Sequence, residues 1–252
     1  MREAAPALPE GFCLHRYKTI GSTNDEAKAL ARAGAPEGTV VWAEEQTAGR
    51  GRRGRVWLSP PGNLYLSLVL RPEGAPSQAA QLGFVAALGL GDALRSLAGP
   101  ALQLRYKWPN DLLANGRKLA GILLESETSA TERVDFVVLG IGVNILTAPE
   151  DVEFPATSLA AEGIAGVTPA AVIEGFARHF AGWAERWRTE GFAPLRTAWL
   201  ARASGLGDQV RVRLDHDTLF GRFEGLDADG ALVLEGADGP RRIAAGEVFP
   251  AS

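Results

Sequence analysis

The segment between Gly49 and Arg55 carries the most conspicuous chemistry of the sequence, because four arginines alternate there with three glycines. Glycine lets a backbone approach an anion closely, and the segment also fits the pattern G-x-G-x-x-G. A dinucleotide-binding loop with that pattern opens a helix, however, and the His-Arg-Asp and Asp-Phe-Gly segments of a protein kinase do not occur in the sequence. The loop therefore predicts an anion site of another kind.

A solvated loop or a nucleic-acid-binding patch is the alternative interpretation of this arginine loop. A nucleic-acid-binding module should present a net basic surface with interleaved aromatic residues. The chain instead has 26 Lys and Arg against 30 Asp and Glu, a formal net charge of −4 and a pI near 5.5. The composition thus favours a local anion site on an otherwise mildly acidic protein.

Three further segments could complete such a site. Lys107-Trp-Pro-Asn-Asp111 places a lysine, an amide and a carboxylate around a proline turn, where they could meet phosphate oxygens and a magnesium ion. The run at 116–125 puts Lys118 at the mouth of a β-like segment, and Gly140-Ile-Gly-Val-Asn144 supplies glycines that permit close packing of a ligand. His15, His179 and His216 are scattered, which argues against a zinc site or a catalytic triad.

The hydrophobic pattern predicts the elements that position these segments. A helix should begin at Ser22 or Thr23, with acidic residues in its first turn, and end at Gly34. Longer helices are expected at 78–97 and 169–190, where apolar residues recur three and four positions apart. Strands are expected at 39–44, 64–70, 102–107, 118–125 and 134–143.

The pattern of the sequence changes after Gly205 from alternating strand-like and helix-like runs to short β-like runs. Short β-like runs at 210–214, 219–224 and 231–235 are separated by Asp-Gly turns, which predicts a small SH3-type barrel docked on the larger domain. We therefore predict a catalytic domain at 1–203 and a β domain at 204–252. Cys13 is the one cysteine, so no intrachain disulfide forms, and we expect a partly buried structural residue. The N-terminus lacks the apolar run of a signal peptide, which predicts a cytoplasmic protein.

Taken together, these segments resemble the signature set of the biotin protein ligases. The resemblance rests on Ser22-Thr23-Asn24, Glu45-Gln46-Thr47-Ala48-Gly49-Arg50-Gly51-Arg52-Arg53-Gly54-Arg55, Lys107-Trp-Pro-Asn-Asp111, Lys118-Leu-Ala-Gly-Ile-Leu123 and Gly140-Ile-Gly-Val-Asn144. It runs from about Thr19 to the end of the chain. It implies an α+β fold of the class II synthetase-like, biotin-lipoate ligase type, in which a mixed sheet with flanking helices precedes an SH3-like β-barrel.

The resemblance implies a two-step reaction. The biotin carboxylate attacks the α-phosphate of ATP to give biotinyl-5′-AMP and pyrophosphate, and a lysine of a biotin carboxyl carrier protein then takes the biotin and releases AMP. Two unit charges 4 Å apart repel by ~1 kcal/mol in water and by about 4 kcal/mol at an effective dielectric of 20, so a dry site must supply cations. The arginine loop, Lys118 and a Mg²⁺ ion that accompanies ATP would supply them, and no tightly bound prosthetic group is expected.

The resemblance also implies a role for individual residues. Lys118 and Arg52 would be catalytic, with Arg52 closing the loop over the adenylate. Biotin would be bound by Ser22, Thr23, Asn24, Gln46, Gly49, Arg50, Gly51, Arg52, Lys118, Gly121, Leu123 and Gly142. The nucleotide would be bound by Arg52, Arg53, Arg55, Trp57, Lys107, Asn110 and Asn144, and Asp111 would hold Mg²⁺ through a phosphate. For several of these, a structural role stays open: helix capping for Ser22, ion pairing for Arg53 and Arg55, and turn stabilisation for Asn110, Asp111 and Asn144.

The chain departs from the family pattern in two places. Only about 20 residues precede the Ser22 helix, too few for the winged helix that binds DNA in some members, so we expect a monofunctional ligase that binds neither DNA nor membrane. The stretch at 146–159 has Phe154 but no tryptophan to cover the adenine, which leaves the adenine contact open. A homodimer is an open possibility. A lipoate ligase is the alternative inside the fold family, and the arginine-glycine loop and β tail favour biotin over it.

Overall fold

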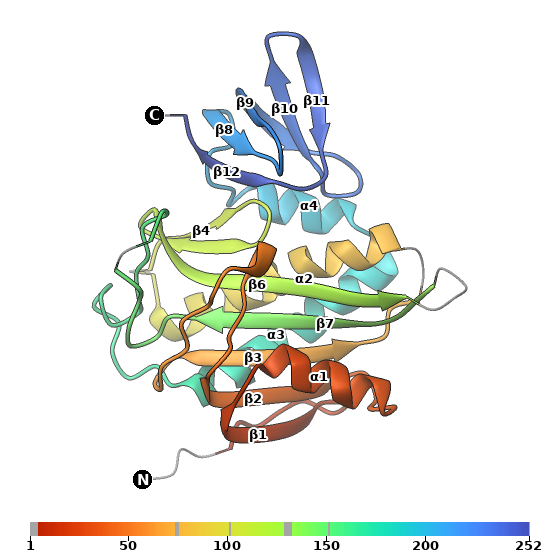
Figure 1. The fold of residues 1–252 in the computed structure, drawn as a ribbon, viewed down its shortest axis with the longest axis vertical. Coiled ribbons are helices and arrows are strands. Elements are labelled where there is room, and N and C mark those ends of the chain that lie inside the picture. Colours follow the sequence, from red (N-terminus) through yellow and green to blue (C-terminus); the bar gives the residue numbers. More distant parts are fainter. Residues whose placement is uncertain (1–4, 74–75, 101, 129–132, 151, 252) are drawn as a thin grey trace.

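The computed structural model describes residues 5–73, 76–100, 102–128, 133–150 and 152–251. A seven-stranded mixed sheet forms its centre (Figure 1). The strands are β1 (Cys13–Ile20), β2 (Thr39–Gln46), β3 (Leu64–Leu70), β4 (Leu104–Lys107), β5 (Asp111–Ala114), β6 (Arg117–Thr128) and β7 (Val134–Val143). Their order is β1-β2-β3-β7-β6-β5-β4, with β1 parallel to β2 and each other neighbouring pair antiparallel.

Helices cover the two faces of this sheet unequally (Figure 1). The helices α2 (Pro76–Ala98) and α3 (Pro169–Glu190) lie on one face, where they bury the main apolar core. The shorter α1 (Thr23–Arg32) lies on the opposite face and buries a smaller cluster that includes Val41, Val69 and Val138. Helix α1 covers only part of this face of the sheet. The segment between β2 and β3 lies over the part next to it (Figure 1). None of the described helices combines the length and apolar character that a bilayer crossing requires.

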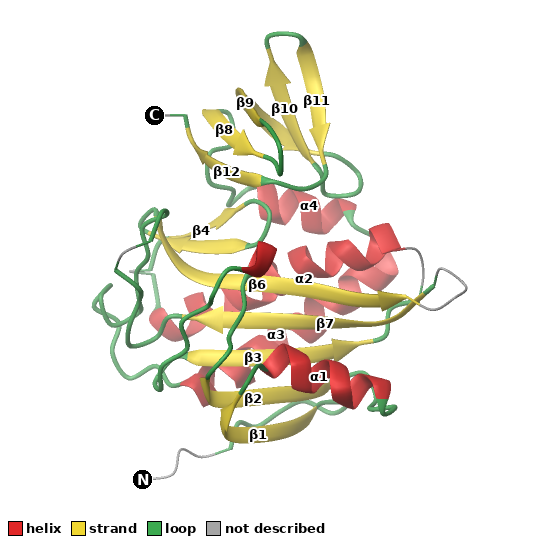
Figure 2. Cartoon of the chain, viewed as in Figure 1, coloured by secondary structure: helices red, strands yellow, loops and turns green. Residues whose placement is uncertain are grey.

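A second, five-stranded sheet follows α4 (Ala193–Leu200) (Figure 2). It consists of β8 (Gln209–Arg213), β9 (Thr218–Leu226), β10 (Leu232–Gly236), β11 (Gly239–Ile243) and β12 (Glu247–Pro250), all antiparallel, in the order β11-β10-β9-β8-β12. It has the SH3-like fold that the sequence predicts. Trp108 Nε1 donates a hydrogen bond to the Gly230 carbonyl oxygen at 3.1 Å, and Gly230 packs on Phe84, so the small sheet is docked on the large domain.

Several predicted elements differ from the structure. The strand expected from residue 102 begins at Leu104, because Leu102 N still donates to Gly99 O in the preceding turn. Strands β1, β5, β11 and β12 and helix α4 were not predicted as elements. Cys13 is exposed rather than partly buried, since it begins a strand at the sheet edge. The boundary between 203 and 204 stays a prediction.

Candidate active site

A cavity of about 470 Å³ lies between the large sheet, the N-terminus of α1 and the arginine loop. Most of the predicted site residues line it, namely Ser22, Thr23, Asn24, Gln46, Arg50, Gly51, Arg52, Arg55, Trp57, Lys107, Asn110, Asp111, Lys118, Gly121, Leu123, Gly142 and Asn144. Gly49 and Arg53 do not line it. The structure therefore brings together in one cavity residues from five segments of the chain.

The arginine loop is a hairpin that folds back on itself. Arg50 and Val56 form an antiparallel bridge, Gly51 N donates to Arg55 O at 2.7 Å, and a 3₁₀ turn, η1 (Arg52–Gly54), forms the tip. Gly49 packs inside the base of the hairpin, because a Cβ atom there would lie 2.5 Å from Ser59 Oγ. That close approach, rather than contact with the cavity, explains the glycine at this position.

The tip of the hairpin is held by the C-terminal sheet. Arg52 Nη1 donates to the Gly246 carbonyl oxygen at 3.1 Å, Arg53 pairs with Asp215 at 2.8 Å, and Arg55 pairs with Glu247 at 2.5 Å. Burial alone would raise the pKa of Glu247, but hydrogen bonds from Arg55 and Arg213 lower it to about 2. The ion-pairing alternative thus describes Arg53 in this structure, whereas Arg55 both pairs and lines the cavity.

A group of buried and half-buried charges lies beneath this tip. Lys118 Nζ is 2.7 Å from Asp111 Oδ1, and Lys107 Nζ is 3.5 Å from Asp111 Oδ2. Burial lowers the pKa of Lys107, and the Asp111 carboxylate opposes that shift. Burial likewise lowers the pKa of the Arg52 guanidinium, which stays far above neutrality as for any arginine. With two ammonium groups around one carboxylate, and Arg52 nearby, the site has net positive charge for an anionic ligand.

The donor set at Asp111 fits a resident metal ion poorly. Both ammonium groups lie against its carboxylate, and they would repel a cation. Within residues 5–73, 76–100, 102–128, 133–150 and 152–251, no cluster of three or more His, Cys, Asp or Glu side chains is arranged to bind a metal. A Mg²⁺ ion would then have to be carried by the phosphates of ATP.

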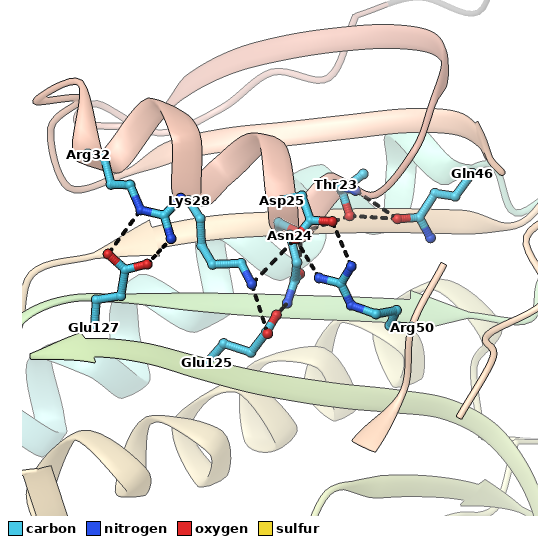
Figure 3. A network of polar contacts seen from close by, with 10 residues as sticks. Thr23, Asn24, Asp25, Lys28, Arg32, Gln46, Arg50, Glu125 and Glu127 are labelled. Carbon is cyan, nitrogen blue, oxygen red and sulfur yellow. Dashed lines mark hydrogen bonds and ion pairs between the residues drawn. The ribbon is translucent and has the colours of Figure 1, made fainter. Parts of the chain in front are cut away.

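A chain of hydrogen bonds fixes the polar groups at the opposite end of the cavity (Figure 3). Thr23 donates to Gln46 Oε1 from its backbone N at 2.8 Å and from Oγ1 at 3.0 Å, and Gln46 Nε2 donates to Ser59 Oγ at 3.0 Å. The Gln46 amide is thereby oriented at both of its ends. Ser22 occupies the N-cap position of α1, but its side chain makes no capping hydrogen bond, so the capping alternative is not what the structure shows.

Paired glycines form the floor of the cavity. Gly121 of β6 and Gly142 of β7 are register partners, and the Trp57 ring lies against both. A Cβ atom on Gly142 would come within 2.5 Å of Trp57 Cε2, and one on Gly121 would come within 3.0 Å of Trp57 Cζ3. The absence of side chains at these two positions therefore makes room for the Trp57 ring.

The structure also clarifies the asparagines. Asn110 donates from Nδ2 to the Ile122 carbonyl oxygen, which fixes the turn after Pro109, and its Oδ1 lies 3.5 Å from Arg52 Nη1. Asn144 donates from Nδ2 to the Thr157 carbonyl oxygen at 3.0 Å. The Asn110 amide thus holds its turn against β6, the Asn144 amide joins the end of β7 to the segment at Thr157, and both side chains line the cavity.

Sequence reasoning missed several residues of the cavity wall. They include Tyr65, Pro109, Glu153, Glu247 and Phe249. Phe154 and Phe249 lie 6.4 Å apart between ring centroids, and Lys107 Nζ is 4.5 Å and 5.3 Å from those centroids. Phe249 and Glu247 belong to β12, and no local pattern marked that segment as part of a site. The aromatic pair supplies an apolar wall in the region where the sequence leaves the adenine contact open.

Comparison with known proteins agrees with this geometry. Residues 8–201 match the Biotin/lipoate A/B protein ligase family, and residues 205–249 match the Biotin protein ligase C terminal domain. The chain is 49% identical to the biotin–[acetyl-CoA-carboxylase] ligase of Paracoccus denitrificans, covering 90% of this chain and 96% of that protein. It is 37% identical to the bifunctional ligase/repressor BirA of Bacillus subtilis, covering 92% of this chain and 72% of that protein.

Solved structures are similar over nearly the whole chain. The biotin protein ligase of Aquifex aeolicus in complex with biotin and ATP has a TM-score of 0.80 at 28% identity and covers 94% of this chain and 97% of its own. The biotin protein ligase of Leishmania major in complex with biotinyl-5-AMP has a TM-score of 0.63 at 25% identity, with 94% and 98% covered. The C-terminal match also separates the chain from the lipoate alternative. By sequence, fold and C-terminal sheet, the chain belongs to the biotin protein ligase family.

Proposed function

We propose that this biotin protein ligase carries out both half-reactions in the cavity beneath the arginine loop. The chain activates biotin with ATP to give biotinyl-5′-AMP and pyrophosphate, and it transfers the biotin to a lysine of a biotin carboxyl carrier protein, releasing AMP. The observation that supports this placement best is the charge group of Lys118 with the buried Asp111 and Lys107 beside a glycine floor. It offers fixed cations next to the apolar floor of the cavity.

In this proposal, Lys118 exchanges its contact with Asp111 for the biotin carboxylate and the α-phosphate. The Lys118 side chain is 27% exposed and lines the cavity, while its partner Asp111 is nearly buried. A cation aimed at the phosphoryl oxygens stabilises the charge that develops as the carboxylate attacks. Lys107 and Arg52 then bind the remaining phosphate oxygens, and Phe154 and Phe249 line the space for the base.

Arg52 closes the adenylate off from water in the same proposal. Its side chain contacts Gly246 and Asn110, so it spans the cavity from the hairpin tip to the C-terminal sheet. A mixed anhydride of a carboxylic acid and a phosphate hydrolyses readily, and excluding water preserves it until the carrier lysine arrives. The amine then attacks the acyl carbon, the amide C–N bond forms, and the C–O bond to phosphate breaks.

The remaining assignments are also proposals. Gln46, Thr23 and Ser22 would face the ureido ring of biotin, which has two N–H donors and one carbonyl acceptor. The acceptor would be the carrier domain of acetyl-CoA carboxylase or a related carboxylase, reached in the cytoplasm. A homodimer and the absence of DNA binding stay predictions from the sequence, as does Mg²⁺ brought in with ATP.

ATP–pyrophosphate exchange with the purified protein tests the function directly. We expect exchange that depends on biotin and is unchanged by lipoate. Exchange that depends on lipoate instead would favour the alternative ligase, and no stimulation by either acid would overturn the proposal. Labelling of a purified carrier domain with biotin, compared with a carrier whose acceptor lysine is replaced by arginine, tests the second step separately.

A further inference from the structure

Asp25 holds one side of the arginine loop from outside the cavity (Figure 3). The carboxylate lies in the first turn of α1, and Arg50 Nη1 donates to Oδ2 at 2.6 Å while Nη2 donates to Oδ1. Two parallel bonds between a planar guanidinium group and a planar carboxylate fix their relative orientation. Because Arg50 is also bridged to Val56, the fork ties both strands of the hairpin to α1.

A second carboxylate extends this connection to β6 (Figure 3). Lys28 Nζ is 3.4 Å from Asp25 Oδ1 and 2.9 Å from Glu125 Oε1. Glu125 Oε2 in turn accepts a hydrogen bond of 2.6 Å from Asn24 Nδ2, and Asn24 lines the cavity. The arginine loop, α1 and β6 therefore share one set of charged contacts at the end of the cavity that Thr23 and Gln46 also line.

The Asp25–Arg50 pair is suited to positioning rather than to stability. The side chains are 52% and 37% exposed, and exposed ion pairs contribute little to the free energy of unfolding. The hairpin tip is anchored independently by the C-terminal sheet through Arg52, Arg53 and Arg55. Asp25 is thus the direct charged partner of Arg50 at the hairpin base, and without its charge Arg50 would keep only the longer-range attraction of Glu125, opposed by the like charge of Lys28.

We propose that Asp25 is a positioning residue for biotin, which holds Arg50 so that the base of the hairpin stays closed over the end of the cavity lined by Thr23 and Gln46. This role rests on the proposed function of the cavity. The hydrogen bonds from Arg50 lower the pKa of Asp25, so its carboxylate is charged at neutral pH. Loss of that charge should weaken retention of biotin and of its adenylate, while leaving the reacting groups at Lys118 in place.

Replacement of Asp25 by asparagine tests this role. We expect Asp25→Asn to raise the KM for biotin about three- to tenfold, with kcat of pyrophosphate exchange and KM for ATP changed less than about twofold. Asp25→Glu keeps the charge and should recover most of the biotin affinity. Glu127→Gln is the matched control, because Glu127 pairs with Arg32 and so also joins α1 to β6, but away from the loop.

A double variant separates positioning from a general effect of charge. If Asp25 acts through Arg50, Asp25→Asn combined with Arg50→Gln should release adenylate no faster than Arg50→Gln alone. The role of Asp25 would be overturned if the double variant released adenylate faster than Arg50→Gln, by the factor that Asp25→Asn shows alone. It would also be overturned if Asp25→Asn and Glu127→Gln changed the KM for biotin equally. Wild-type protein without biotin-dependent exchange would overturn the proposed function itself, whereas normal wild-type exchange with an unaltered Asp25→Asn variant would overturn only this inference.

Discussion

The Lys118 ammonium group lies 2.7 Å from the Asp111 carboxylate, and this contact keeps a cation in place at the centre of the cavity. Asp111 is almost buried and also lies 3.5 Å from Lys107, so a single acid holds two lysines toward the cavity. A substrate carboxylate or phosphate that enters meets cations that are already oriented. Prior orientation reduces the reorganisation needed as charge develops in the reaction.

Removal of the Lys118 charge should therefore disable adenylation without unfolding the protein. We expect Lys118→Ala to reduce the rate of biotin-dependent pyrophosphate exchange by about 10²–10³-fold, the range found when one preorganised group is lost from a transition state. Lys18→Ala, which changes an exposed lysine of β1, is the control. Near-normal exchange in Lys118→Ala would refute the catalytic role.

Loss of Arg52 should release the intermediate instead of preventing its formation. We expect Arg52→Gly to make biotinyl-5′-AMP but to lose it to solvent, because the side chain that spans the cavity to Gly246 is gone. The measurement is biotin label on the lysines of an unrelated protein present in the reaction. Arg241→Gly, at an exposed arginine of β11, serves for comparison, and equal background labelling by the two variants would count against a closing role.

The Glu247 carboxylate should make stability depend on acid pH. Its pKa is about 2 in the folded protein against 4.5 for a free side chain, so the stabilisation is complete above about pH 5 and is lost as the pH falls toward 2. We expect Glu247→Gln to lower the free energy of unfolding by about 1–2 kcal/mol at pH 7, allowing for solvent around its partner Arg55.

Urea unfolding of the wild type and of Glu247→Gln at pH 7, 5 and 3 measures this difference. The difference in the free energy of unfolding between the two proteins should be smaller at pH 3, because the wild type has then lost part of the stabilisation from the charged Glu247. A gap of the same size at all three pH values would show that packing, and not the ion pairs with Arg55 and Arg213, accounts for the effect.

A methyl group on Gly142 should displace Trp57 from the floor of the cavity. A Cβ atom there would lie 2.5 Å from the ring, and overpacking of this kind costs about 1–3 kcal/mol. We expect Gly142→Ala to shift the tryptophan fluorescence and raise the KM for biotin, with a smaller effect for Gly121→Ala, where the approach is 3.0 Å. Gly182→Ala in α3 meets no neighbour within 4 Å and should change neither quantity.

Elements with a strong apolar pattern were predictable from the sequence. The bounds of β3, β7 and α3 agree with the predicted 64–70, 134–143 and 169–190, because continuous apolar runs and a regular apolar stripe are strong local signals. Strand β1 was missed since its residues are mixed in polarity and half exposed, and its pairing with β2 is what makes it a strand. Strand β5 is only four residues long and follows a turn.

The site was predictable to the extent that its residues lie in short motifs. Lys118, Asn110 and Arg52 come from such motifs and meet in the cavity. Glu247 and Phe249 reach it only through the docking of the C-terminal sheet, and Asp25 acts through a contact with a loop 25 residues away. Long-range packing of this kind leaves no pattern in neighbouring residues, so only the structure places these side chains.

The anchoring of the hairpin tip by β12 also sets an order of events during protein synthesis. Arg55 and Glu247 are 192 residues apart, and Arg52 and Gly246 are 194 apart, so the loop leaves the ribosome long before its anchor is made. A nascent chain that has folded its large sheet still lacks the contacts that close the cavity. The contacts that hold the hairpin tip over the cavity can therefore form only after β12 has been synthesised and has docked.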